Sequence, residues 1–258
     1  MLFWGIIGAY VQAPNFISKL PSSLKQAGME ETVYLRFTSV WYATLIILSL
    51  SAIAVGIASI LYYQTGTLPY LIRYSKLGAS TYFASLYLGN LVASFILEAL
   101  LTISVVYMFS NNGIGISATP SKLEIIIPTI LLSSIFFISF AVFLNLAVIK
   151  FNAYRFQNLF NYIPLVLGFL AFSIFTYMTI ESPAVYYSNP YMAIQILLYY
   201  GYSGSFEFSN ATGVVTTLDL SPILLFLSII AWIVILNVIN FILLRKIYYL
   251  SIEEGRII

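Results

Sequence analysis

An uncharged run from Phe37 to Tyr63 constrains the fold of this chain more than any other feature. It is longer than the ~20 apolar residues that a helix needs to cross the hydrocarbon core of a bilayer. Aromatic residues lie near both of its ends, as they do at the interfaces of membrane helices: Trp41, Tyr42, Tyr62 and Tyr63. Only 8% of the chain is charged, whereas soluble domains carry about 25%. We therefore expect an all-α, polytopic membrane protein.

Further apolar runs predict four more spans, over residues 81–109, 125–149, 156–180 and 220–244. Residues 1–14 are also apolar but cover only about half of a span. They fit a short first span, an interfacial helix or the end of a span whose start is missing, and we favour a short or truncated first span. The prediction is a single transmembrane domain over residues 1–258 with about six transmembrane helices.

Two connectors between the apolar runs are long. Residues 15–36 are predicted to be a polar connector, and residues 181–219 form the longest loop. Within that loop, residues 191–200 are apolar, but as a helix they measure only about 15 Å, which is too short to cross. We expect an extracellular interfacial or re-entrant helix there, before the last span.

Charge predicts the orientation of the spans. One side of the membrane would hold the 64–80 loop, the 150–155 turn and the C-terminal tail. This side carries only two acids, Glu253 and Glu254, against seven cations. The cations are Arg73, Lys76, Lys150, Arg155, Arg245, Lys246 and Arg256. The other side carries four cations, Lys19, Lys25, Arg36 and Lys122, and most of the acids. The positive-inside rule makes the first side cytoplasmic, which predicts a multi-pass cell-membrane protein with a cytoplasmic C-terminus. Asn210, in an N-x-[ST] sequon, then falls outside as a candidate glycosylation site.

Several function classes are excluded by residues that the chain lacks. It has no His, no Cys and a single Asp, Asp219, so catalytic triads, Cys nucleophiles, aspartyl dyads and His- or Cys-bound metals are not available. It has no G-x-x-x-x-G-K-[ST] motif for ATP and no basic block for nucleic acid. We expect a protein that is not an enzyme and that holds no cofactor or metal of its own.

The loop over residues 64–80 has the pattern of a short helix. Thr67 is suited to cap it, Pro69 to its first turn and Gly78 to its end. At about 100° per residue, one face holds Leu68, Leu71 and Ile72, and the other holds Tyr70, Tyr74 and Leu77 with Arg73 at its edge. A helix with two apolar faces fits a soluble partner that accepts one of them, or a flat position among lipid headgroups. The residues alone leave both alternatives open.

Short motifs in this chain resemble the permeases of type-2 ABC exporters. Gly66-Thr67-Leu68 follows an outside-to-inside span, where that family has a G-T-L-E type sequence. Tyr87-Leu88-Gly89-Asn90-Leu91 enters the next span, where the family has a G-K-L type sequence, and Asn189-Pro190-Tyr191 is similar to its N-P-L/Y motif. The chain departs from the family pattern at Pro69, which replaces Glu, and at Asn90, which replaces Lys.

The resemblance implies a permease subunit that dimerises with a second copy or a homologue. Its cytoplasmic coupling helix would contact two separate ABC ATPase subunits, which bind the ATP and Mg²⁺. The coupling residues carried over from the motif and its helix are Gly66, Thr67, Leu68, Leu71, Arg73, Tyr74 and Lys76. Asn189 and Pro190 would form the hinge of an outer gate helix, although their simplest interpretation is a helix stop and start.

Polar residues within the spans are the remaining candidates. Glu98 is the one ionisable side chain near the middle of a span, and it fits either a substrate or proton contact or a neutral side chain that ties helices together. The amides of Asn145, Asn237 and Asn240 fit a translocation path, but we favour hydrogen bonds between helices.

Two other functions stay open at this stage. One is a non-transporting membrane anchor or scaffold subunit of a larger membrane complex. The other is an ion-coupled secondary transporter, which would need Glu98. The transported substrate is not indicated, because Ile, Leu, Phe and Tyr lining a cavity do not distinguish between substrates.

Overall fold

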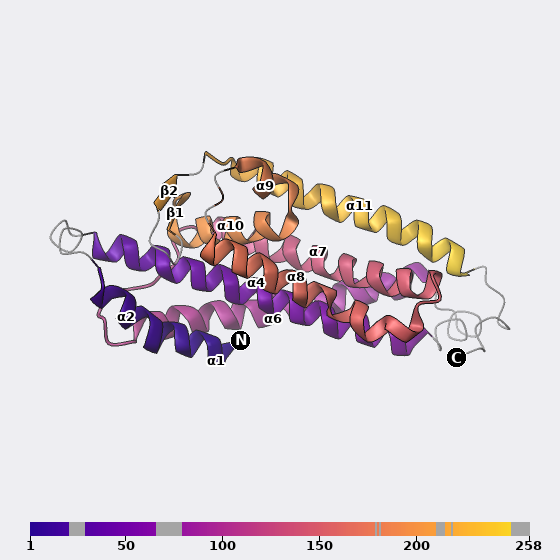
Figure 1. The fold of residues 1–258 in the computed structure, drawn as a ribbon. Helices are drawn as coiled ribbons and strands as arrows, with labels where there is room; N and C mark the ends of the chain where they lie inside the picture. Colours follow the sequence, from indigo (N-terminus) through magenta and orange to yellow (C-terminus); the bar gives the residue numbers. More distant parts are fainter. Residues whose placement is uncertain are drawn as a thin grey trace.

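The computed structural model describes residues 1–20, 29–65, 79–178, 180, 182–209, 215–217 and 219–248. Long helices run up and down an elongated bundle (Figure 1): α4 (Glu30–Thr65), α6 (Ala79–Ser110), α7 (Leu123–Lys150), α8 (Gln157–Tyr177) and α11 (Pro222–Tyr248). Each contains a stretch that is long and apolar enough to cross a membrane. The prediction of an all-α, polytopic membrane protein is confirmed.

The N-terminal residues form a short helical path beside the long helices. It consists of α1 (Leu2–Ile6), the π-helical segment η1 (Ile7–Gln12) and α2 (Ala13–Ser18). Gly5 packs near Met108 of α6, and Gly8 faces the Trp41 ring of α4. The Phe16 ring stacks on Phe37 with 4.5 Å between centroids. The path runs along the bundle (Figure 1), and each of its helical segments is too short to cross a membrane by itself, so the short first span stays a prediction.

The polar connector predicted over residues 15–36 is too long. Helix α2 continues to Ser18 and α4 begins at Glu30, so Arg36 lies inside a helix. Glu30 and Glu31 occupy the first turn of α4, where the helix dipole favours negative charge. Their charge caused the start of the helix to be predicted too late, because acidic residues in the first turn of a helix are as hydrophilic as loop residues.

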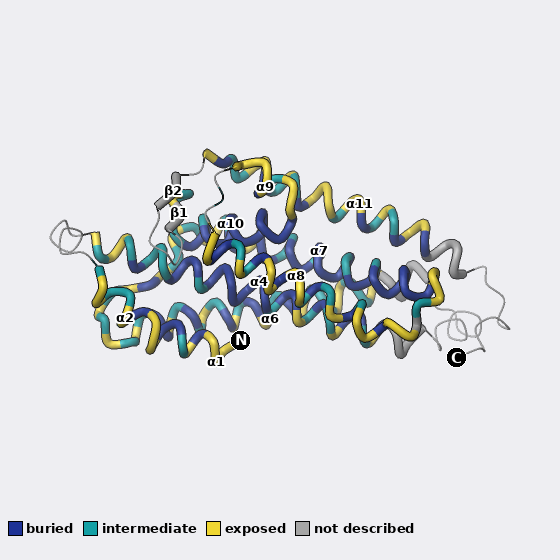
Figure 2. Tube along the Cα trace, viewed as in Figure 1, coloured by how far each residue is buried: buried dark blue, intermediate teal, exposed yellow. Residues whose placement is uncertain are grey.

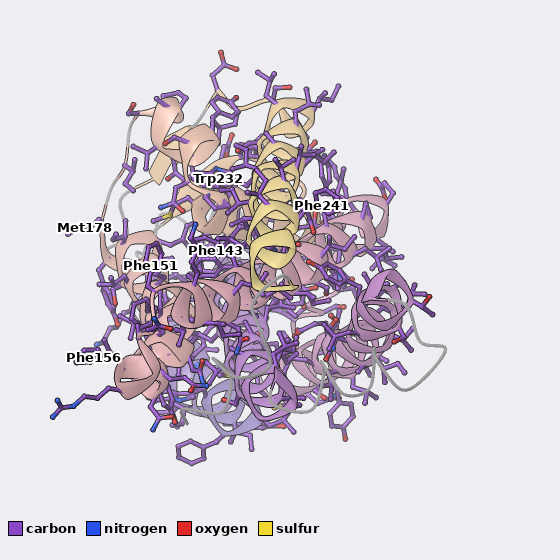
Figure 3. All side chains as sticks on the ribbon, turned by 90° about the vertical axis from the view of Figure 1, so that its right-hand side faces the viewer. Phe143, Phe151, Phe156, Met178, Trp232 and Phe241 are labelled. Atoms are coloured by element: carbon purple, nitrogen blue, oxygen red, sulfur yellow. The ribbon has the colours of Figure 1, made fainter. Side chains whose placement is uncertain are left out.

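The core of the bundle lies along α4 and α7. About 61% of the apolar window of each is buried, against 17% for α11 (Figure 2). Large apolar side chains cover the outside of the molecule, and Phe151, Phe156, Met178 and Phe241 are each more than half exposed (Figure 3). Such a surface needs lipid around it, since water would not solvate so many apolar side chains.

A short helix, α10 (Pro190–Ser203), is buried among the long helices. Its 14 residues reach about 21 Å. At its start, the Tyr191 ring meets Phe136 and Phe137 edge-on, and the hydroxyl donates to the Pro164 carbonyl at 3.3 Å. Both the re-entrant and the interfacial alternative stay predictions for α10. An apolar stretch of this length does not distinguish the two, because both bury the same residues from water.

The start of α10 is capped as the Asn-Pro pair suggests. Helix α9 (Pro183–Ser188) ends one residue before Asn189, and α10 begins at Pro190. The Asn189 Oδ1 accepts a hydrogen bond from the Tyr191 N–H at 3.0 Å. An N-cap of this kind contributes about 1 kcal/mol and fixes where the helix begins. The stop-and-start interpretation therefore describes the local geometry.

One end of the bundle, which the charge pattern predicts to face outside and which we call the outer end, is held by contacts that the sequence did not indicate. A small antiparallel hairpin pairs β1 (Glu207–Ser209) with β2 (Val215–Thr217), with Glu207 opposite Thr217. Arg36 of α4 forms an ion pair with Glu207, and the Tyr199 hydroxyl donates to the Glu207 carbonyl at 2.5 Å. The Lys122 N–H donates to the Gly201 carbonyl at 2.8 Å, which ties the loop before α7 to the end of α10.

The opposite end carries the 151–156 turn, which contains the 3₁₀ segment η2 (Tyr154–Phe156). The ends of α4 and α11 and the start of α6 lie at this same end (Figure 1). These are the connections that the charge pattern predicts to be cytoplasmic.

Candidate functional site

The segment with the strongest motif joins α4 to α6 and lies outside the described residues. It contains all of the proposed coupling residues: Gly66, Thr67, Leu68, Leu71, Arg73, Tyr74 and Lys76. Asn210 also lies outside the described residues, between β1 and β2. The candidate site that the structure describes is therefore the set of polar side chains inside the bundle.

One group of these side chains joins three helices, and we call it the asparagine cluster: Tyr87 of α6, Ser139 of α7, and Asn237 and Asn240 of α11. The Tyr87 hydroxyl lies 3.0 Å from Asn237 Oδ1 and 3.3 Å from Ser139 Oγ. Asn237 Nδ2 donates to Ser139 Oγ at 2.9 Å, and Asn240 Nδ2 donates to the Ser139 carbonyl at 2.9 Å. The two amides thus join α11 to α7, as we favoured, and Tyr87 adds α6 to them.

Replacing Tyr87 by Phe tests the strength of this cluster. The ring stays and only the hydroxyl is lost, so the hydrogen bond that it donates to the cluster disappears. We expect the free energy of unfolding in detergent micelles to fall by about 0.6–1.7 kcal/mol, the range measured for hydrogen bonds between membrane helices. Ser104→Ala is the matched control, because Ser104 is only partly buried on the same helix and its hydroxyl donates to the Leu100 carbonyl within that helix. An equal loss in both variants would contradict a role of Tyr87 between helices.

A second pair of amides holds α4. Asn145 Nδ2 of α7 donates to the Ala58 carbonyl at 3.2 Å, and Asn161 Nδ2 of α8 donates to Ser59 Oγ at 3.3 Å. Both acceptors lie within one turn of α4, so the two amides link α4 to α7 and to α8. This position for Asn145 also agrees with a bond between helices.

Glu98 lies between α6 and α4 and is fully buried. It belongs to the buried face of α6, whose members recur every three or four residues: Ser94, Glu98, Leu101, Val105 and Met108. Neither carboxylate oxygen has a hydrogen-bond partner. The Ser49 hydroxyl of α4 is a neighbour of the carboxylate but does not reach hydrogen-bond geometry. The carboxylate is therefore a buried polar group without a bond between helices.

Hydroxyl groups of α4 and α6 form a polar contact next to Glu98. The Tyr42 hydroxyl of α4 and the Thr102 hydroxyl of α6 lie 3.1 Å apart, and Thr102 also donates to the Glu98 carbonyl at 2.7 Å. The Tyr42 ring packs against Tyr202 of α10, with 4.8 Å between centroids. The sequence reading missed these hydroxyls, because single Tyr, Ser and Thr residues in apolar runs carry no positional signal.

Gln195 is a further buried polar residue that the sequence reading did not single out. It lies in the middle of α10, is fully buried, and neither amide atom has a hydrogen-bond partner. A glutamine in an apolar helix of this length could have been noticed, since burying an amide without partners costs about 1–3 kcal/mol. The structure does not bring it into a bond with Glu98 or with the asparagine cluster.

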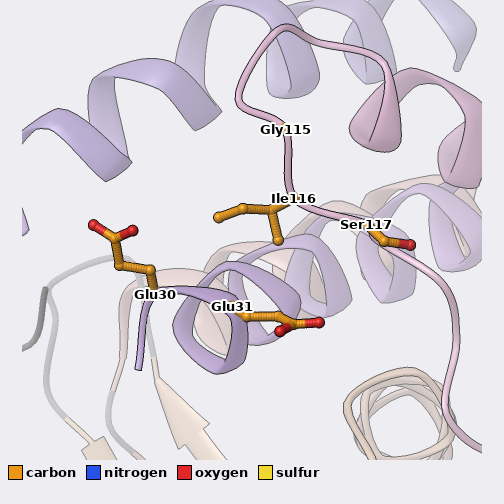
Figure 4. A pocket seen from close by; sticks show the side chains of 5 residues that line it. All are labelled: Glu30, Glu31, Gly115, Ile116 and Ser117. Atoms are coloured by element: carbon orange, nitrogen blue, oxygen red, sulfur yellow. The ribbon is translucent and has the colours of Figure 1, made fainter. Parts of the chain in front are cut away.

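Two hollows on the surface are lined by residues other than these buried polar groups. One is lined by Glu30, Glu31 and the loop residues Gly115, Ile116 and Ser117, and its two carboxylates point in different directions (Figure 4). Within the described part of the chain, acidic side chains do not gather in threes to hold a metal ion. The hollow between the N-terminal path and α6 is lined mainly by apolar side chains.

The chain matches no protein-family model, and no curated protein or solved structure matches it. Its function is therefore argued from the bundle, the polar groups and the motifs alone.

Proposed function

We propose that this chain is the membrane-spanning permease subunit of an ATP-driven exporter that resembles the type-2 ABC family. The observation that carries the proposal is the buried helix α10 between the last two spans. It begins at the Asn189-Pro190 pair, is capped by Asn189, and returns to the outer end of the bundle at Gly204. In this proposal α10 is a broken element at membrane depth, which is tolerated where protein surrounds it.

The two ends of the bundle support the same assignment. The resemblance places a coupling helix in the segment between Thr65 and Ala79, at the end where the cations gather. The outer end carries α9, α10 and the hairpin. In this proposal ATP is hydrolysed by a separate soluble subunit, and the permease works as a dimer in the cell membrane with its C-terminus in the cytoplasm.

A test of the proposal is purification of the chain from its native membrane in mild detergent, followed by measurement of ATP hydrolysis. We expect a soluble ATPase with a P-loop to co-purify in about equal amount, and its activity to be sensitive to vanadate. A stable complex that contains other membrane subunits but no ATPase would instead support the anchor or scaffold function.

Glu98 favours one alternative function, the ion-coupled secondary transporter. A buried carboxyl group within a span is often part of an ion pathway. That alternative requires flux that follows an ion gradient without ATP. Flux into vesicles that is unchanged by ATP and lost in Glu98→Gln would replace the exporter proposal.

A further inference from the structure

Glu98 is the strongest unexplained group in the molecule, because its burial and its surroundings do not suit an ion. Its side chain is fully buried and both carboxylate oxygens lack hydrogen-bond partners. On the same face of α6, the neighbouring buried positions are Ser94 and Leu101. A carboxylate in such a position has lost its water and gained no donors in return.

The polar groups near the Glu98 carboxyl group are hydroxyls of α4, those of Ser49 and Tyr42. On its own helix, the Thr102 hydroxyl donates to the Glu98 backbone carbonyl. The Tyr42 hydroxyl is engaged with Thr102, and Tyr42 is the one titratable side chain near the carboxyl group among the described residues. The ion pair of the described part of the chain, Arg36 with Glu207, lies at the outer end of the bundle. No described cation therefore compensates a charge on Glu98.

We propose that Glu98 is a proton-binding site whose occupancy is linked to the packing of α6 on α4. In the packed bundle, the carboxylate takes a proton from water and becomes a neutral carboxylic acid, which the buried interface accommodates. When α6 separates from α4 and water enters, the acid returns the proton to water and ionises. This inference holds whether or not an ATPase is the partner.

Helix α6 lies at the edge of the bundle, with one face packed on protein and the other exposed. Its outer face is open to lipid, with Leu97, Leu100 and Ile103 each more than half exposed. On its inner face, the Tyr42–Thr102 contact is the hydrogen bond beside the carboxyl group. Because Tyr42 also packs on Tyr202 of α10, a change at this interface reaches that helix as well.

Proton binding at Glu98 makes the packing equilibrium depend on pH in a defined direction. A glutamate in water ionises near pH 4.3, so at neutral pH the unfolded or opened chain holds no proton at this position. The packed chain holds one, so raising the pH disfavours packing. For a single proton, the equilibrium constant between packed and unfolded forms falls tenfold for each pH unit while the packed form keeps its proton.

Infrared difference spectroscopy of the full chain in bilayers tests the site directly. We expect a carboxylic-acid C=O band at pH 7 that shifts in deuterated water and is lost in Glu98→Gln. The matched control is Glu124→Gln, since Glu124 is exposed in the first turn of α7 and its replacement removes the same carboxyl group from the surface instead of the interior. A spectrum with carboxylate bands alone at pH 7, unchanged in form by Glu98→Gln, would overturn the proposal.

Two further measurements keep the proposal testable if the variant folds poorly. A hydrophobic carbodiimide reacts with protonated carboxyl groups in apolar surroundings, so we expect it to label Glu98 of the unaltered chain near neutral pH. In reversible unfolding, the tenfold change per pH unit is expected to disappear in Glu98→Gln and to remain in Glu124→Gln. Labelling of other acids with Glu98 untouched, or equal pH slopes in both variants, would contradict proton binding at Glu98.

Discussion

Replacing Leu71 by Asp is expected to remove ATP hydrolysis from the purified protein while leaving its insertion into the membrane unchanged. Leu71 shares one apolar face of the predicted coupling helix with Leu68 and Ile72, and Arg73 lies at the edge of the other face. A charge placed in the centre of an interface typically costs more than about 2 kcal/mol, which lowers affinity by about 30-fold. Arg73→Glu is expected to act in the same direction.

The controls for this prediction separate lost binding from lost insertion. Arg155→Glu reverses a charge on the same predicted side but outside the coupling segment, and it should retain the ATPase. Because the chain has no Cys, single introduced cysteines report the orientation of each variant without background labelling. Correctly oriented Leu71→Asp protein that retains full ATP hydrolysis would count against a coupling role for residues 66–78.

The second large effect is expected at the contact between α8 and α4. A Cβ at Gly168 would lie 2.5 Å from Ser51 Oγ and 3.1 Å from Ser51 Cβ. The Ser51 side chain is fully buried and donates to the Ile47 carbonyl at 2.7 Å, so rotation of its hydroxyl relieves only part of the overlap. Overpacking of this kind costs about 1–3 kcal/mol. We expect Gly168→Ala to destabilise the bundle in reversible unfolding, despite the better helix propensity of Ala.

A double-mutant cycle identifies the cause of that loss. Ser51→Gly removes both atoms that the new methyl group meets, so the pair Gly168→Ala and Ser51→Gly should recover stability relative to the sum of the single variants. Gly56→Ala is the matched control on α4, because a Cβ there would meet no heavy atom within 4 Å beyond its chain neighbours and the nearby backbone of its own helix. Additive effects in the cycle would show that the two helices do not meet as described.

Hydropathy predicted the long helices because each lipid-exposed span must be apolar over its whole length. The run over residues 125–149 became α7 (Leu123–Lys150), with an error of a residue or two at each end. The boundary at residues 15–36 failed because Glu30, Glu31 and Arg36 lie within α4, where capping and ion pairing rather than burial determine the residue type.

The polar groups inside the bundle were only partly predictable. Asn237 and Asn240 stood out because amides are rare in apolar runs, but their partner Ser139 carried no signal of its own. Glu98 was evident from its charge, whereas its neighbour Ser49 lies 49 positions away along the chain. Which small polar residue meets which depends on how the helices are rotated, and one sequence does not specify that rotation.

The buried position of α10 could be predicted only in part from the sequence. Its length excluded a full span, and Asn189-Pro190 marked its start correctly. Its burial depends on a space between α4, α7 and α11 that exists only once those helices have packed. Tertiary structure, rather than local pattern, therefore determines how far α10 is buried.

Photo-cross-linking from position 71 tests the central claim most directly. A photo-reactive phenylalanine in place of Leu71, irradiated in native membranes, is expected to capture a soluble ATPase, identified by mass spectrometry of the product. The same residue in place of Asn111, exposed at the other end of the bundle, should not capture it. Products that contain only lipid from position 71, or an ATPase captured equally from position 111, would contradict the permease account.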